Sequence, residues 1–328
     1  MNHHIYHLLE HWYPQRDTGR WLLATVIGTQ GSAYRKRGAT MLFSDQGQQL
    51  GLISGGCLEQ DLFHQARKCW ETNTSRQVVY DMQEEGDIAW RLGIGCGGEV
   101  RLLLQPISAD NLYLELDKLF RALQRKQTVV YAQSLEAGIA CGKIVSGEPA
   151  SQSWFTHTVQ PPVHLGILGG GVDAQPLANM AANLGWLVTV NDPRARYARR
   201  SEFPSAHHVD DSKPEFLADC EWFIRCDALI VMHHQVKMDA SALQTIARQP
   251  PTSLRYLALL GPFHRSEKVL QQAQLEESQL PVALQAPAGL AIGGDLPESI
   301  ALSMLAQAHA TLFQRNARPL KGQPCSIG

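Results

Sequence analysis

The sequence predicts an α/β protein of two domains, an N-terminal α+β domain with a mixed sheet and a C-terminal domain built on a doubly wound parallel sheet. The 328 residues are enough for two hydrophobic cores. Short strands and turn residues fill the first half, whereas strands alternate with amphipathic helices in the second. A polar stretch at 151–162 ends in two prolines and is typical of a linker. We therefore expect domains at 1–150 and 163–316, with a frayed polar tail at 317–328.

The first half carries the elements of an α+β domain. Apolar residues between Ile5 and Trp12 recur at helical spacing, and Pro14 ends that helix. Trp21–Ile27 has the apolar run of a buried strand. The other predicted elements are a hairpin at 39–43 and 49–53, a helix from Cys57 to about Trp70, strands at 77–80 and 100–104, a helix over 112–123 and a strand from Val129.

The second half opens with a strand at 163–168 that runs directly into a glycine turn. The turn has the pattern G-x-G-x-x-A, in which Gly169 allows the tight bend, Gly171 lets the backbone approach a phosphate and Ala174 lets the following helix pack. A second strand at 186–190 leads to Asp192, which is placed to bind a ribose hydroxyl. This order predicts a Rossmann-like fold with NAD(P) as a candidate ligand; the alternative is the same fold with a vestigial nucleotide site.

The later elements continue this alternation. Strands are predicted at 227–232 and 255–260, and a final helix at 296–313. Ligands bind beyond the carboxyl ends of such strands, so His234, which follows the first of these strands, belongs on the same rim as Gly169. The alternative for His234 is a solvated loop histidine.

Two cysteines lie between glycines in the first half. One is in Ser54-Gly55-Gly56-Cys57-Leu58-Glu59 and the other in Gly93-Ile94-Gly95-Cys96-Gly97-Gly98. Glycines leave backbone N–H groups uncovered beside each thiol, which suits an anionic ligand that also needs a sulfur. The alternative is two glycine turns that contain small, inert cysteines.

Composition excludes several other functions. The net charge of −2 provides no field that would attract nucleic acid. No run approaches the roughly 18 apolar residues of a membrane-spanning helix. The seven cysteines are odd in number and irregularly spaced, and the N-terminus lacks the pattern of a signal peptide, so we expect a reducing, cytoplasmic location.

Several motifs together resemble the XdhC/CoxI family. In the first half these are Gly31–Gly38, Ser54–Glu59 and Gly95–Gly98. The second half is similar to that family's Rossmann domain over Gly169–Ala174, 188–194, 231–239, 259–261 and 286–293. The resemblance covers nearly the whole chain. It implies an accessory protein for molybdenum hydroxylases such as xanthine dehydrogenase, which binds molybdenum cofactor (molybdopterin), protects it while its terminal sulfur is installed, and delivers it to the apo-enzyme.

The resemblance also implies site residues and partners. The implied cofactor-binding residues are Gly55, Gly56, Cys57, Glu59, Cys96, Gly97 and Gly98, joined by Gly169, Gly171, Asp192 and His234 on the Rossmann rim. Cys57 and Cys96 are the candidate metal ligands, because a soft thiolate suits molybdenum or a sulfur in transfer. The implied partners are a molybdenum hydroxylase client and a cysteine desulfurase, and we expect a homodimer.

Two other functions are compatible with parts of the sequence. One is an NAD(P)-dependent oxidoreductase that uses the Rossmann half, with Cys57 or Cys96 as a reactive thiol. The other is an adaptor without any ligand. No Tyr-x-x-x-Lys pair or other hydride-transfer constellation is recognisable, which favours a maturation and insertion factor over an enzyme.

Overall fold

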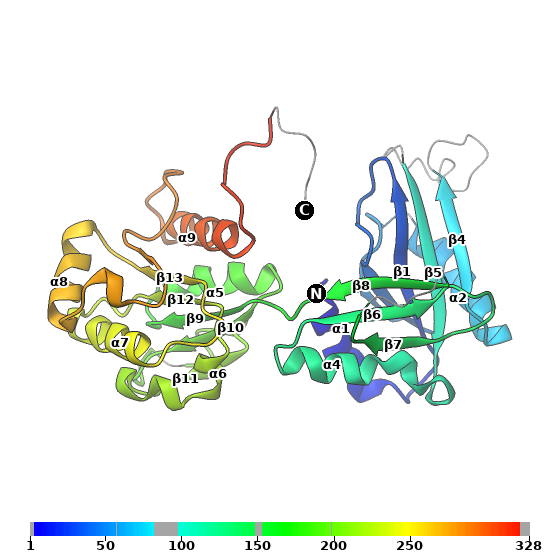
Figure 1. Ribbon diagram of the computed structural model, residues 1–328, viewed down its shortest axis with the longest axis horizontal. Helices are drawn as coiled ribbons and strands as arrows, with labels where there is room; N and C mark the ends of the chain where they lie inside the picture. The colour runs from blue at the N-terminus through cyan, green and yellow to red at the C-terminus, as the bar shows by residue number, and fades with distance from the viewer. Residues whose placement is uncertain (1–2, 57, 82–97, 148–152, 198, 322–328) are drawn as a thin grey trace. The chain divides into compact units, whose positions relative to one another are not determined.

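The chain consists of two compact units, Met1–Pro162 and Val163–Gly328. The computed structural model describes residues 3–56, 58–81, 98–147, 153–197 and 199–321. Each unit has its own sheet structure and its own core (Figure 1). The predicted mixture of an α+β first half and a parallel α/β second half is confirmed.

The main sheet of the first unit is antiparallel and has the strand order β3-β2-β1-β5-β4. Alternate side chains on its central strands are buried together with the apolar face of a single helix, α2, which covers one side (Figure 1). The bounds are β1 (Trp21–Gln30), β2 (Thr40–Ser44), β3 (Gln49–Gly51), β4 (Arg76–Asp81), β5 (Glu99–Ile107) and α2 (Glu59–Thr72).

A second, three-stranded antiparallel sheet completes the first unit, in the order β7-β6-β8. Its strands are β6 (Val129–Ser134), β7 (Gly142–Val145) and β8 (Trp154–Val159). The unit also contains α1 (Ile5–Trp12), η1 (Tyr13–Gln15), η2 (Ala109–Glu115) and α4 (Leu116–Gln124), of which η2 and α4 contact this sheet. Buried Gln133 on β6 donates to Thr25 Oγ1 (3.0 Å) and to Gln105 Oε1 (2.9 Å), which lie on β1 and β5 of the main sheet. These buried hydrogen bonds join the two sheets directly and fix their positions within the unit.

The linker predicted at 151–162 is wrong over Trp154–Val159, which form β8 and pair antiparallel with β6. The residues alternate in burial, with Phe155 and Val159 inside and Thr158 exposed. A strand with one solvated face contains as many polar as apolar residues, so its composition resembles that of a loop. The alternation of inward and outward residues and the β-favouring residue types indicated a strand here, but the polar composition outweighed them in the prediction.

The helix predicted over 112–123 begins four residues later, at Leu116. Leu112 has a φ of 55° and the next three residues are also left-handed, so this stretch cannot continue a right-handed helix. The Asn111 side chain accepts from Ser108 N (3.1 Å) and donates to Pro106 O (2.8 Å). These local bonds offer the backbone an alternative to the helix that apolar periodicity does not reveal.

The second unit contains a six-stranded, wholly parallel sheet in the order β11-β10-β9-β12-β13-β14. This is the strand order of a Rossmann domain, so the predicted fold is confirmed. The strands are β9 (His164–Leu168), β10 (Leu187–Asn191), β11 (His208–Asp210), β12 (Ala228–Val231), β13 (Tyr256–Leu259) and β14 (Leu284–Gln285).

Helices cover both faces of this sheet and bury a separate core on each. One core includes α5 (Ala174–Asn183) and α9 (Pro297–Leu312), which also contact each other. The other is formed with η3 (Pro214–Asp219), α6 (Glu221–Ile224), α7 (Val236–Arg248) and α8 (Phe263–Ala273). Within the described ranges, no helix has the length and apolar character needed to cross a membrane.

His157 on β8 makes the first unit sensitive to acid. Its ring stacks on Phe155 and meets Tyr131 edge-on, and burial, aided by the charge of Arg37, lowers its pKa to about 4. Between pH 6.5 and 4 the unfolded chain therefore holds a proton that the folded chain does not, so stability falls as the pH drops. This group alone accounts for at most about 3 kcal/mol.

His157→Phe should therefore lose less stability than the native protein when the pH is lowered from about 7 to about 5. Urea unfolding at both pH values measures the difference. His4, whose pKa burial also lowers to about 4, leaves a residual pH dependence in the variant. An identical loss in the variant and the native protein would show that His157 does not couple protonation to folding.

Candidate functional site

The first predicted motif forms a turn closed by its own serine and glutamate. Ser54 donates from its backbone N to Glu59 Oε1 (3.1 Å) and from its hydroxyl to Oε2 (2.6 Å). The same hydroxyl accepts from Gly56 N (3.3 Å) and Leu58 N (3.1 Å). Both side chains are buried, whereas Gly55 and Gly56 are exposed. Glu59 therefore holds the turn from inside while the glycine backbone faces outward.

Glycine is required at Gly56 for a backbone reason. Its φ is 104°, and an added Cβ would meet nothing within 4 Å. The residue is therefore selected for its left-handed conformation, and the space beside it is open. Cys57, the next residue, lies outside the described residues.

The contributions of Ser54 and Glu59 to the stability of the protein should not be additive, because the two side chains bond to each other. Ser54→Ala and Glu59→Ala should each lower the free energy of unfolding by about 1–3 kcal/mol, because each leaves buried partners without a hydrogen bond. The double variant should lose little more than the larger single loss. Urea denaturation of the four proteins gives this double-mutant cycle. Additive losses would mean that the two side chains stabilise the protein independently.

The second motif is described only at its last residue, Gly98, since Cys96 and Gly97 lie outside the described residues. A Cβ on Gly98 would lie 2.3 Å from Ser32 O and 2.6 Å from Gln30 O. Glycine is thus needed here because the chain entering β5 passes directly against the backbone that leaves β1.

The Rossmann turn in the second unit is tightly packed at its first glycine. Gly169 has a φ of 129°, and a Cβ there would lie 2.4 Å from the backbone of Met232. Gly171 is different, because the nearest atom to a Cβ added there would be His234 Cδ2 at 3.8 Å. Ala174 at the start of α5 is fully buried. These contacts bring Gly169, Gly171 and His234 together at the carboxyl ends of β9 and β12.

Asp192 is fully buried, and its carboxylate is occupied by neighbouring donors. Oδ2 accepts from Gly170 N (2.9 Å), and Arg194 donates to Oδ1 from Nε (2.9 Å) and to Oδ2 from Nη2 (2.7 Å). Burial acts to raise the pKa of Asp192, but these hydrogen bonds outweigh it and the pKa is lowered. A ribose hydroxyl would have to compete with Arg194 for this carboxylate.

His234 bonds to the first turn of the adjacent helix. Its Nε2 lies 3.1 Å from Asp173 Oδ2, and Asp173 is the N-cap residue of α5. The Asp173 carboxylate makes no capping hydrogen bond to α5, but its negative charge lies beside the helix N-terminus, to which a phosphate would be attracted. A backbone oxygen, Tyr197 O, would also lie 2.6 Å from a Cβ on Gly170.

A buried polar network beside this turn escaped the sequence predictions. Asp239 on α7 accepts from the backbone N (3.0 Å) and Nδ1 (2.9 Å) of His233, and Arg265 on α8 donates to its other oxygen. Arg194 Nη2 donates to His233 O (3.3 Å), which joins this network to Asp192. The signal available in the sequence was an aspartate, Asp239, six residues after a histidine at the end of a predicted strand.

No group of three or more His, Cys, Asp or Glu side chains within the described ranges is arranged to hold a metal ion. The predicted metal ligands, Cys57 and Cys96, both lie outside those ranges. At the Ser54–Glu59 turn the glycine backbone is exposed and borders open space, but the N–H groups of Gly56 and Leu58 already donate to Ser54 Oγ.

Known proteins and family models match this sequence along nearly the whole chain. A model of the XdhC Rossmann domain matches residues 165–308, and a model of the XdhC and CoxI family matches residues 15–81. A protein of Bacillus subtilis described as a probable xanthine dehydrogenase subunit is 30% identical over 315 residues, which covers 89% of this chain and 93% of that protein.

Two further similarities extend this result. The molybdenum cofactor insertion chaperone PaoD of Escherichia coli is 25% identical over 294 residues, covering 87% of this chain and 81% of that protein. The crystal structure of a protein described as a xanthine dehydrogenase from Bacillus halodurans matches with a TM-score of 0.79 and 30% identity, covering 98% of each chain. The chain therefore belongs to the XdhC and CoxI family.

Proposed function

We propose that this protein is an accessory chaperone that binds molybdenum cofactor and inserts it into a molybdenum hydroxylase of the xanthine dehydrogenase type. The observation that carries the proposal is the similarity, along 87% or more of the chain, to a molybdenum cofactor insertion chaperone and to a probable xanthine dehydrogenase subunit. The first unit supplies the features that support cofactor binding, namely two glycine–cysteine motifs.

The roles proposed for individual residues follow from their chemistry. Cys57 and Cys96 would contact the metal or its labile sulfur as soft thiolates. Gly55 and Gly56, with Gly97 and Gly98, would let the cofactor approach the backbone, and Glu59 would keep the first turn in shape through Ser54. The bound cofactor itself supplies the redox centre of the client enzyme.

Handling of this cofactor implies partners and a location. We propose protection of the cofactor during installation of its terminal sulfur, with a cysteine desulfurase as the source of that sulfur. The client would be an apo molybdenum hydroxylase. A homodimer in the cytoplasm is the form in which we expect the protein to act.

Reconstitution tests the proposed delivery. Apo hydroxylase is mixed in air with cofactor-loaded protein, with free molybdenum cofactor in equal amount, or with protein lacking cofactor. The loaded protein should restore more hydroxylase activity than free cofactor, and the unloaded protein should restore none. Equal recovery from free cofactor would remove the need for a chaperone and contradict the proposal.

The oxidoreductase alternative is not favoured. The acid that should bind a ribose, Asp192, is bonded to Arg194 and to the glycine turn, and the Asp173 carboxylate adds a negative charge beside the helix N-terminus that would attract a phosphate. We therefore expect no sustained oxidation of NAD(P)H with carbonyl acceptors. Steady turnover that Asp192→Ala abolishes would favour the oxidoreductase instead.

A further inference from the structure

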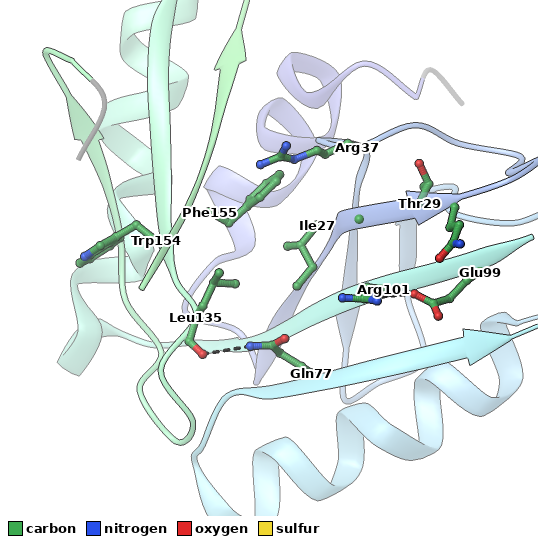
Figure 2. A pocket seen from close by; sticks show the side chains of 11 residues that line it. Ile27, Thr29, Arg37, Gln77, Glu99, Arg101, Leu135, Trp154 and Phe155 are labelled. Atoms are coloured by element: carbon green, nitrogen blue, oxygen red, sulfur yellow. Dashed lines mark hydrogen bonds and ion pairs between the residues drawn. The ribbon is translucent and has the colours of Figure 1, made fainter. Parts of the chain in front are cut away.

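A pocket of about 500 Å³ opens in the first unit between the ends of its two sheets (Figure 2). Its lining includes Ile27, Arg37, Glu99, Arg101, Trp154 and Phe155. These residues come from β1, the loop after it, β5 and β8, so the pocket exists only because both sheets fold together. The volume is in the range of small-molecule binding sites.

A β-bulge shapes one wall of this pocket. The pairing of β1 with β5 shifts between Val26 and Gly28, which leaves Ile27 as an extra residue. A Cβ on Gly28 would lie 3.5 Å from Arg101 Cδ. Arg101 therefore packs against the backbone of Gly28, and Figure 2 shows Ile27 between the side chains of Arg101 and Arg37.

The opposite wall is aromatic. The guanidinium carbon of Arg37 lies 4.8 Å from the centroid of the Phe155 ring. Trp154 is the preceding residue, and Lys143 Nζ lies 4.2 Å from the centroid of its ring. The Phe155 ring is buried and also stacked with His157, so its part in the pocket is to hold the Arg37 guanidinium in place through a cation–π contact.

The charge in the pocket is predominantly positive. Arg101 Nε pairs with Glu99 Oε1 at 2.6 Å, whereas Arg37 makes no ion pair with any acidic side chain in the described part of the chain. One cation is therefore compensated and one is available. A guanidinium is also the side chain that binds carboxylate or phosphate in a bidentate manner.

The pocket adjoins the second glycine–cysteine motif. Gly98, the last residue of that motif, packs against the backbone of Gln30, which also lines the pocket. The residue after it is Glu99. A ligand in this pocket would therefore lie next to the described end of the motif to which cofactor binding is assigned.

We infer that this pocket binds a planar heteroaromatic ring that carries an anionic group, with Arg37 and Arg101 holding the anion and Ile27, which lies between them, contacting the ring. This inference rests on the proposed function, in which the ligand is the pterin of molybdenum cofactor with its phosphate. Glu99 opposes the anion and restrains Arg101 in the absence of ligand.

The test measures binding of 6-carboxypterin, a fluorescent planar anion, to the full chain without cofactor. Uncharged 6-hydroxymethylpterin and inorganic phosphate are the comparison probes. Arg37→Gln should weaken binding of 6-carboxypterin at least tenfold, and Glu99→Gln should strengthen it several-fold because it removes a negative charge. Arg67→Gln is the matched control, because Arg67 lies 5.0 Å from the Phe63 ring in the same unit but does not line the pocket.

A merely structural role of these residues would not give effects of opposite sign. The inference is overturned if 6-carboxypterin does not bind, if Arg37→Gln and Arg67→Gln have the same effect, or if phosphate or the uncharged pterin binds as tightly as 6-carboxypterin. Cofactor content separates it from the proposed function. Native protein that carries molybdopterin, with equal amounts in Arg37→Gln, would overturn the pocket alone, whereas native protein without molybdopterin would overturn the function.

Discussion

Asp239→Ala should destabilise the second unit by about 3–5 kcal/mol, because it removes the acceptor from a buried charged cluster. Asp239 is fully buried, and Arg265, which donates to it, is only 17% exposed. The substitution leaves that guanidinium without a carboxylate and leaves the backbone N–H of His233 without an acceptor. Urea unfolding of the full chain, followed by amide exchange in β12, measures the loss.

Asp219→Ala provides the matched control, since Asp219 is an exposed aspartate in the same unit. It should change the stability by less than about 0.5 kcal/mol. Asp239→Asn should lie between the two, because an amide still accepts from His233 but no longer balances the charge of Arg265. A loss for Asp239→Ala as small as for Asp219→Ala would mean that the cluster contributes little to the fold.

Cys57→Ala and Cys96→Ala should each reduce the molybdenum cofactor retained on purification at least tenfold. The reason is the loss of a soft sulfur ligand, for which alanine has no substitute. Cys220→Ala is the control. Cys220 lies in the second unit, where burial raises the pKa of its thiol and its Sγ donates to Ser212 Oγ at 3.4 Å.

Molybdenum analysis and pterin fluorescence of the three variants and the native protein provide the measurement. Each variant should keep the native content of secondary structure. Equal retention in all three variants would show that neither glycine–cysteine motif holds the cofactor.

The parallel half of the fold could be predicted from the sequence because its signals are local. Its buried strands are short apolar runs, its helices are amphipathic, and Gly169 marks the first strand–helix turn. The half-solvated strand β8 was missed because Thr156 and Thr158 give it a polar composition. The start of α4 was misplaced because the left-handed conformation at Leu112 leaves no trace in apolar periodicity.

The candidate site was less predictable because its contacts join distant segments. The sequence identified Gly98 as unusual, but it could not show that the reason is close contact with Gln30 and Ser32. The bond between Asp239 and Arg265 spans 26 residues, and the pocket beside Ile27 needs strands from both sheets. Such sites are formed by tertiary packing and become visible only when the fold is known.

The central claim is that this chain carries molybdenum cofactor. The most direct test is to purify the full chain anaerobically from a molybdenum-replete host and to oxidise it, so that any bound molybdopterin is released as a fluorescent pterin. The proposed function predicts pterin and molybdenum in near-equal amounts, at a substantial fraction of the protein concentration. Protein that contains neither, while a molybdenum enzyme from the same cells contains both, would contradict it.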